Sequence, residues 1–217
     1  MRLRLALIVI GALLVIATYT FPYWQTAVLG TREEVTVLFP GLPMDMQSAF
    51  ANLPPDQQRA YQEIAATDPP RAVRMVTTAL QPRIPLPEED QEMPEMNAPV
   101  PIAAGTFARI DPVRWGQGRI TAYQGVDNLL LLRFEDFAMP NGPDLRVVLT
   151  AAESPATVDA MRAGETDAFE VGPLLSSVGA QKYELPEGFN LSPFRSVVIY
   201  SDELGLVYTY AVLSVRQ

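Results

Sequence analysis

The chain of 217 residues contains no cysteine and no histidine. These absences exclude disulfides, thiol nucleophiles, catalytic triads built on histidine, and zinc or iron–sulfur sites that need Cys or His ligands. A haem iron held by a protein Cys or His is excluded for the same reason. Lysine is also scarce, with Lys182 as its only example. The sequence therefore predicts no catalytic residues, no metal site and no bound cofactor, and it does not favour an enzyme.

Positive charge is in short supply as well. The 16 basic residues face 25 acidic residues, which gives a formal net charge of −9. Nucleic acids carry a dense negative charge, and a protein that binds them needs a basic surface. We therefore predict no nucleic-acid partner, and we interpret the acidic surface as a source of solubility.

Charge is absent altogether from the segment that follows Arg2 and Arg4. Residues 5–24 are almost entirely apolar, end in aromatic residues, and match the ~20 residues that an α-helix needs to cross a bilayer. Two arginines before this segment place the N-terminus in the cytoplasm. We predict a transmembrane signal anchor within residues 1–30, with the lipid bilayer as partner of residues 5–24, and an extracytoplasmic C-terminal domain.

A cleaved signal peptide is the alternative interpretation of this segment. The apolar run 5–17 also has the length of the core of a signal peptide. The sequence that follows it, Thr18-Tyr19-Thr20-Phe21-Pro22, lacks the small residues that precede a cleavage site. We therefore favour the uncleaved anchor, and both interpretations place the remainder of the chain outside the cytoplasm.

Three segments follow the anchor. Residues 31–80 are predicted to form a small, mostly helical membrane-proximal region, because Pro55 and the pair Asp68-Pro69 are typical of helix starts. Residues 81–104 are rich in proline and acidic residues, and we expect an extended linker that holds the next domain away from the membrane. Residues 105–217 have the length of one ordinary domain.

This last segment has the pattern of an all-β sandwich or barrel. Short runs of apolar and β-branched residues alternate with turns rich in Gly, Pro, Asn and Asp. One helix-like stretch, 154–163, interrupts the pattern, and we expect it to cross one end of the sheets. The candidate strands are 106–110, 118–124, 129–134, 145–150, 169–174, 181–185, 196–201 and 206–213.

Several short motifs follow one another along the same segment. They are Gly105-Thr106-Phe107, Gly118-Arg119-Ile120-Thr121-Ala122-Tyr123, Asn141-Gly142-Pro143-Asp144-Leu145, Gly172-Pro173-Leu174, Gln181-Lys182-Tyr183-Glu184-Leu185-Pro186 and Val197-Val198-Ile199-Tyr200-Ser201. In this order, residues 105–214 resemble the DM-13 domain, also called the electron-transfer DM-13 domain. The resemblance implies an extracytoplasmic β domain that acts in redox chemistry or electron transfer, often beside DOMON modules and b-type cytochromes.

The chain departs from the family at one position. The resemblance implies that the active group is a cysteine at the end of a Val-Val-Ile-Trp-Cys-like strand. Ser201 occupies that position here. A serine hydroxyl does not cycle between thiol and disulfide. This departure therefore counts against the redox role that the resemblance implies.

The candidate functional residues are Ser201, Tyr200, Asp144, Tyr183 and Phe134. Ser201 either marks the rim of a pocket or is a structural residue at the end of its strand. The ring of Tyr200 either stacks on a ligand or relays electrons, or it is a core or cross-strand partner. The carboxylate of Asp144 either binds a cation or bonds its own turn. The rings of Tyr183 and Phe134 either stack on a ligand or lie in the core.

Together these observations predict a membrane-anchored extracytoplasmic protein with a DM-13-like β domain. The first hypothesis is a non-catalytic binding or interaction module of the cell envelope, whose partner is an envelope protein or a small ligand. The second hypothesis, which the resemblance implies, is an accessory component of extracytoplasmic electron transfer.

Overall fold

A computed structural model describes residues 38–96, 98–126, 129–163 and 168–215. The predicted membrane anchor, its 5–24 span and its orientation lie outside these residues. Within the described ranges, no helix has the length and apolar character that crossing a membrane requires.

Three helices open the described part of the chain. They are α2 (Met44–Ala51), α3 (Pro55–Thr67) and α4 (Pro69–Ala79). The Asp68 carboxylate caps α4 by accepting a hydrogen bond from the Arg71 backbone N–H at 3.1 Å. The helices pack around aromatic rings, with the centroids of Phe39 and Phe50 4.8 Å apart. The helical character expected from the sequence is therefore present in residues 44–79.

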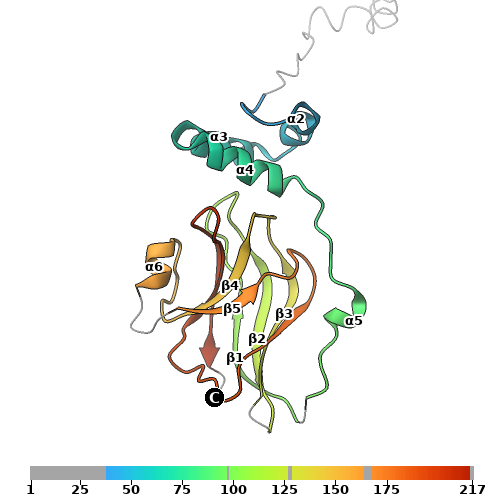
Figure 1. The fold of residues 1–217 in the computed structure, drawn as a ribbon, viewed down its shortest axis with the longest axis vertical. Helices are drawn as coiled ribbons and strands as arrows, with labels where there is room; N and C mark the ends of the chain where they lie inside the picture. Colours follow the sequence, from blue (N-terminus) through green and yellow to red (C-terminus); the bar gives the residue numbers. More distant parts are fainter. Residues whose placement is uncertain (1–37, 97, 127–128, 164–167, 216–217) are drawn as a thin grey trace, which may run out of the picture. The chain divides into compact units, whose positions relative to one another are not determined.

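The rest of the chain forms two antiparallel sheets packed face to face (Figure 1). One sheet has five strands in the order β6-β3-β2-β1-β9, and the other has four in the order β5-β4-β7-β8. The predicted β-sandwich is therefore confirmed. The strands are β1 (Val100–Thr106), β2 (Gln117–Gln124), β3 (Leu130–Ala138), β4 (Leu145–Thr150), β5 (Phe169–Pro173), β6 (Gln181–Glu184), β7 (Ser196–Ser201), β8 (Leu206–Val212) and β9 (Ser214–Val215).

The first strand differs from the sequence prediction. We expected it at 106–110, with a linker before residue 105, but β1 begins at Val100 and pairs with both β2 and β9. Pro101 cannot donate a backbone hydrogen bond, and the register between β1 and β2 shifts beside it, between Pro101 and Ala103. Pro101, one of the prolines that indicated a linker, is thus accommodated at an irregular point of a strand.

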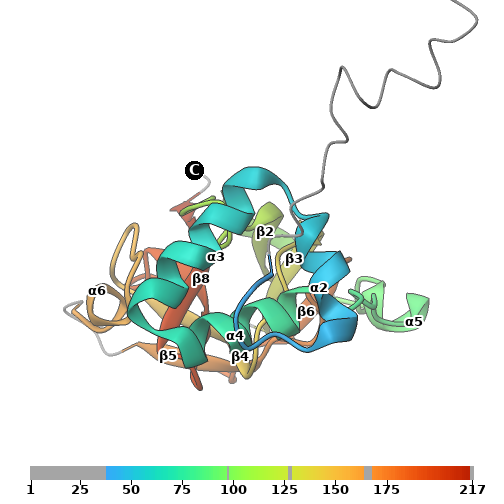
Figure 2. The same ribbon diagram turned by 90° about the horizontal axis from the view of Figure 1, so that it is seen from above.

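The predicted linker is also bound to the β domain. It contains the short helix α5 (Glu88–Gln91), which runs beside the sandwich (Figures 1 and 2). Backbone carbonyls of the segment 81–104 accept three hydrogen bonds from the sandwich. The donors are Ser176 Oγ at 2.7 Å, Arg133 Nη2 at 2.7 Å and Lys182 Nζ at 3.1 Å. The segment is therefore a strap along the sheet, rather than the extended spacer that its composition predicted.

The helix of the β domain lies within the predicted stretch 154–163, but its position on the sandwich differs from the expected one. It is α6 (Val158–Arg162), and Thr157 caps it by accepting from the Ala160 backbone N–H. Met161 packs against Val148 and Val198. The helix covers the outer face of the four-stranded sheet, and does not cross an end of the sandwich, because its apolar side chain needs an apolar face to bury against.

The two ends of the sandwich have different surroundings. At the helix end, where β3 and β7 finish, Asn141 Nδ2 donates to the carbonyl of Gln81 at 2.8 Å and Glu203 pairs with Arg74 of α4. At the pocket end, where β3 and β7 begin, a cavity opens into the core. The six residues of β7 separate the two ends by about 17 Å.

Candidate functional site

Ser201 lies at the helix end and is completely buried. Its hydroxyl donates to the carbonyl oxygen of Pro143 at 2.5 Å and accepts from the backbone N–H of Leu204 at 3.2 Å. These bonds join the end of β7 to the turn before β4 and to the turn before β8. The hydroxyl is therefore engaged in holding two turns, and it does not line the pocket at the opposite end of the sandwich.

Tyr200 and Asp144 lie close to Ser201 but face other neighbours. The hydroxyl of Tyr200 donates to Asp202 Oδ1 at 3.2 Å, and burial and this carboxylate both raise the pKa of Tyr200. Asp144 has a left-handed backbone, with φ of 42°, and its carboxylate accepts from Arg146 Nε at 2.8 Å. The sequence thus identified three residues that share one corner of the fold, and each is paired with a protein group.

Phe134 and Tyr183 belong to the core between the sheets. The Phe134 ring is fully buried and lies 5.4 Å from the Tyr183 ring and 5.0 Å from the Phe107 ring. The Tyr183 hydroxyl donates to Gln181 Oε1 at 2.9 Å and accepts from the Leu175 N–H at 3.1 Å. Burial raises the pKa of Tyr183 above its ordinary value.

Carboxylates do not gather into a cation site in the part of the chain that the structure describes. Several carboxylates of β3 and β5 pair with arginine instead. Asp136 and Glu135 lie 3.8 and 3.9 Å from the Arg119 guanidinium, and Glu170 accepts from Arg146 at 2.9 Å. The chemistry of these groups is that of surface ion pairs.

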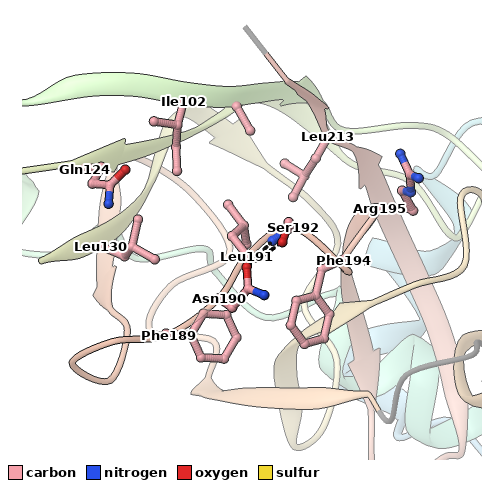
Figure 3. Close-up of a pocket in the computed structure, with 11 residues that line it drawn as sticks. Ile102, Gln124, Leu130, Phe189, Asn190, Leu191, Ser192, Phe194, Arg195 and Leu213 are labelled. Atoms are coloured by element: carbon pink, nitrogen blue, oxygen red, sulfur yellow. Dashed lines mark hydrogen bonds between the residues drawn. The ribbon is translucent and has the colours of Figure 1, made fainter. Parts of the chain in front are cut away.

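A pocket of about 300 Å³ opens at the pocket end (Figure 3). Its walls come from the start of β1, the end of β2, the start of β3, the residue after β8 and the 185–195 loop between β6 and β7. The lining residues are Ile102, Ala103, Gln124, Leu130, Phe189, Asn190, Leu191, Ser192, Phe194, Arg195 and Leu213.

The 185–195 loop is folded tightly enough to serve as a wall. Its two turns are closed by the Phe189 N–H to the Pro186 carbonyl and by the Phe194 N–H to the Leu191 carbonyl, each at 3.0 Å. The Phe189 and Phe194 rings stack with centroids 5.4 Å apart and planes 14° apart. Leu191 and Phe194 are part of the main core, so the wall is continuous with the sandwich interior.

The polar groups of the pocket differ in whether they already bond another group of the protein. Asn190 Oδ1 accepts from the Ser192 backbone N–H at 3.1 Å, so that oxygen is engaged within the loop. Arg195 is exposed, and it forms no ion pair with any acidic residue that the structure describes. An apolar cavity with one uncommitted cation at its rim is suited to a small, mainly apolar molecule.

Sequence reasoning missed this pocket. Its lining is spread over five elements, and only the packing of two sheets brings them together. One signal was available: Phe189, Leu191 and Phe194 are large apolar residues within a stretch that otherwise reads as a turn, with Gly188 and Pro193 among them. Turn segments are normally polar, so apolar residues at such positions indicate a loop that folds over a core.

Comparison with known proteins places the β domain in a family. Residues 109–213 match the family model described as "Electron transfer DM13". A search of the curated proteins finds no match. Two solved structures match, both mutants of superoxide dismutase 5 from Candida albicans. The first is 13% identical over 54% of this chain and 92% of that chain, with a TM-score of 0.39. The second is 15% identical over 54% and 94%, with a TM-score of 0.38.

Proposed function

Since the C-terminal segment of the chain is a DM13 domain, we propose that this domain is a non-catalytic binding module displayed outside the cytoplasm by a membrane anchor. The observation that carries the proposal is the pocket of about 300 Å³ at the pocket end. Sites for small molecules are concave, mostly apolar and furnished with a few polar groups, with volumes of about 300–1,000 Å³. This pocket has that character and lies at the lower end of the range.

The helix end supports the same conclusion by contrast. The hydroxyl of Ser201 is committed to two turns, and the Asp144 carboxylate to Arg146. A ligand that approached Ser201 would have to displace internal hydrogen bonds. The pocket of about 450 Å³ that opens beside Asp144 at this end has a more polar lining. At the pocket end the walls are apolar and the cation of Arg195 is exposed, so binding there costs less rearrangement.

A blocking variant tests the proposed site. The full chain is purified in detergent micelles and screened against small apolar compounds by thermal unfolding. A Ser192→Trp substitution places an indole at the pocket rim, while Ser154→Trp adds the same ring at an exposed position outside the pocket lining. We expect compounds that raise the Tm of the unmodified chain to lose that effect with Ser192→Trp and keep it with Ser154→Trp. Equal shifts in both variants would place binding elsewhere.

The display outside the cytoplasm rests on Arg2, Arg4 and the uncharged span 5–24. A C-terminal alkaline phosphatase fusion, which is active only outside the cytoplasm, should be active in cells. A C-terminal fusion to a reporter that functions only in the cytosol should be silent. The opposite pair of results would reject the anchored, extracytoplasmic arrangement. It would not affect the proposal that the pocket binds a small molecule.

The second candidate function is an accessory role in extracytoplasmic electron transfer, which the family description favours. The absence of Cys and His from the sequence leaves the chain without the usual protein ligands for haem iron. Absorption spectra of the purified full chain separate the two candidates. Stoichiometric haem or flavin bands would support the electron-transfer role, whereas a spectrum of tyrosine and tryptophan alone, together with ligand-dependent Tm shifts, would support the binding module.

A further inference from the structure

We infer that the pocket takes a small single-chain carboxylic acid, with its apolar chain in the cavity and its carboxylate at Arg195. The inference rests on the proposed binding function and specifies the ligand class. It depends on the size of the cavity, on the apolar character of its walls and on the charge at its rim.

The size of the cavity limits the ligand to one short chain. A volume of about 300 Å³ equals that of roughly ten liquid water molecules, and so accommodates on the order of ten non-hydrogen atoms. A chain of eight to ten carbons fits this limit. A phospholipid with two long chains exceeds it several-fold.

The walls favour a hydrocarbon chain over a polar ligand. Leu130, Leu191 and Leu213 converge on the space in Figure 3 from three separate segments. The stacked rings of Phe189 and Phe194 supply the remaining apolar surface. Burial of a methylene group in such surroundings contributes about 0.8 kcal/mol, so binding should strengthen with each added carbon until the cavity is full.

Arg195 supplies a positive charge at the edge of the pocket lining, and Figure 3 shows its exposed side chain apart from the three leucines, so it must turn toward a bound anion. The backbone of Arg195 is held on both sides, since its N–H donates to the Thr150 carbonyl and its own carbonyl accepts from the Leu213 N–H, both at 2.8 Å. Its side chain is exposed and lacks an acidic partner among the described residues. An unpaired cation at an apolar mouth favours an anionic end group over a neutral or cationic one.

Calorimetric titration of the full chain in nonionic detergent with saturated acids from hexanoate to hexadecanoate, below their critical micelle concentrations, tests the chain length. We expect affinity to rise with length up to octanoate or decanoate and then to level off or fall. Affinity that continues to rise to hexadecanoate would overturn the size limit. Retention of a cell-derived phospholipid that is lost with Ser192→Trp and kept with Ser154→Trp, detected by mass spectrometry, would overturn the single-chain ligand.

Octanol and octylamine test the charge. Octanoate should bind about 1.5 to 5 times more tightly than octanol, which is the range for an exposed ion pair, and octylamine should bind more weakly than either. Arg195→Gln should abolish the preference for octanoate over octanol while leaving octanol affinity unchanged. The control Arg59→Gln, which changes an arginine of α3 that is also exposed, should retain the preference.

The possible failures are distinguishable. If octanol and octanoate bind the unmodified chain equally and Ser192→Trp blocks both, the carboxylate inference fails and the proposed binding function stands. If Ser192→Trp blocks neither, the proposed site fails as well. If none of the acids, octanol or octylamine binds while an unrelated compound does so at the pocket, only the ligand class is overturned.

Discussion

The two ends of the sandwich are made by the same strands and differ in how their polar groups are used. At the helix end, Ser201 and Asn141 bond to backbone carbonyls and Asp144 pairs with arginine. At the pocket end, apolar side chains face a cavity and the Arg195 cation has no described acidic partner. The comparison teaches that polar and charged residues at one end can serve stability, while a loop at the other end, with apolar residues in a turn-like stretch, lines the pocket for which binding is proposed. Substitutions should therefore separate stability from binding.

The largest expected effect is the loss of stability when Phe134 is replaced by Ala. The ring is completely buried and contacts the rings of Phe107, Phe137 and Tyr183. Removing it should lower the free energy of unfolding by about 3–5 kcal/mol, measured by urea denaturation monitored by circular dichroism.

A matched substitution at the pocket end sharpens this result. Phe189 is only partly buried, so Phe189→Ala should cost less stability than Phe134→Ala while weakening the ligand response of the pocket. If Phe189→Ala proved the more destabilising of the two, the division between a stability end and a binding end would not hold.

High pH provides the next largest effect. Burial raises the pKa values of Tyr61, Tyr183 and Tyr208 above the ordinary value of about 10. The folded state therefore keeps protons that the unfolded chain releases, so the stabilisation is complete below about pH 10 and is lost as the pH rises through the folded pKa values. The free energy of unfolding should fall above pH 10 by about 1.4 kcal/mol per pH unit for each tyrosine.

Replacement of one tyrosine checks the assignment. With Tyr183→Phe, the free energy of unfolding should fall less steeply above pH 10, because one of the three tyrosines no longer contributes its about 1.4 kcal/mol per pH unit. Urea unfolding at closely spaced pH values measures this slope. A slope identical to that of the unmodified chain would mean that Tyr183 does not contribute. Because Tyr183 bonds Gln181 and Leu175, the variant should also be less stable at pH 7, by about 1 kcal/mol.

The sequence was informative where local pattern and packing agree. The bounds of β4 and β7 were predicted as observed, since both are continuous runs rich in Val, Leu and Ile. All six residues of β7 are buried, because the other sheet covers one face and α6 helps to cover the other. This pattern of continuous apolar residues gives no sign of the environment of Ser201, because one of the two turns that it bonds, at Pro143, lies 58 residues away in sequence.

The sequence was less informative where composition and tertiary contact conflict. Residues 81–104 read as a free linker because prolines and acidic residues do not form a core by themselves. Their backbone carbonyls are instead bonded by Ser176, Arg133 and Lys182. Such contacts follow from the position of a finished sheet, and no pattern within the strap encodes them.

Substitution of Ser201 should have an effect of intermediate size on the free energy of unfolding. Ser201→Ala removes a donor to the Pro143 carbonyl and an acceptor for the Leu204 N–H. Leaving these groups unpaired should lower the free energy of unfolding by about 1–3 kcal/mol in urea denaturation, with ligand affinity at the pocket end unchanged. A loss of ligand binding without a loss of stability would return Ser201 to the candidate site.

A cysteine at the same position examines the family resemblance directly. Since residue 201 is fully buried, the thiol of Ser201→Cys should react slowly with a disulfide reagent in the folded protein and quickly after unfolding in urea. Rapid reaction in the folded state would show that this position is accessible for redox exchange.

The smallest expected effect concerns the ion pair between α4 and the sandwich. The side chains of Arg74 and Glu203 are 58% and 39% exposed, so solvent and salt screen their attraction. Arg74→Ala should therefore lower the free energy of unfolding by less than about 1 kcal/mol, and the loss should shrink further at 1 M salt. A double-mutant cycle with Glu203→Ala isolates the pairwise contribution. If that contribution were several kcal/mol and unaffected by salt, this ion pair would be a main source of stability at the helix end. The contrast between a helix end stabilised by hydrogen bonds and a pocket end with an unpaired charge would then have to be withdrawn.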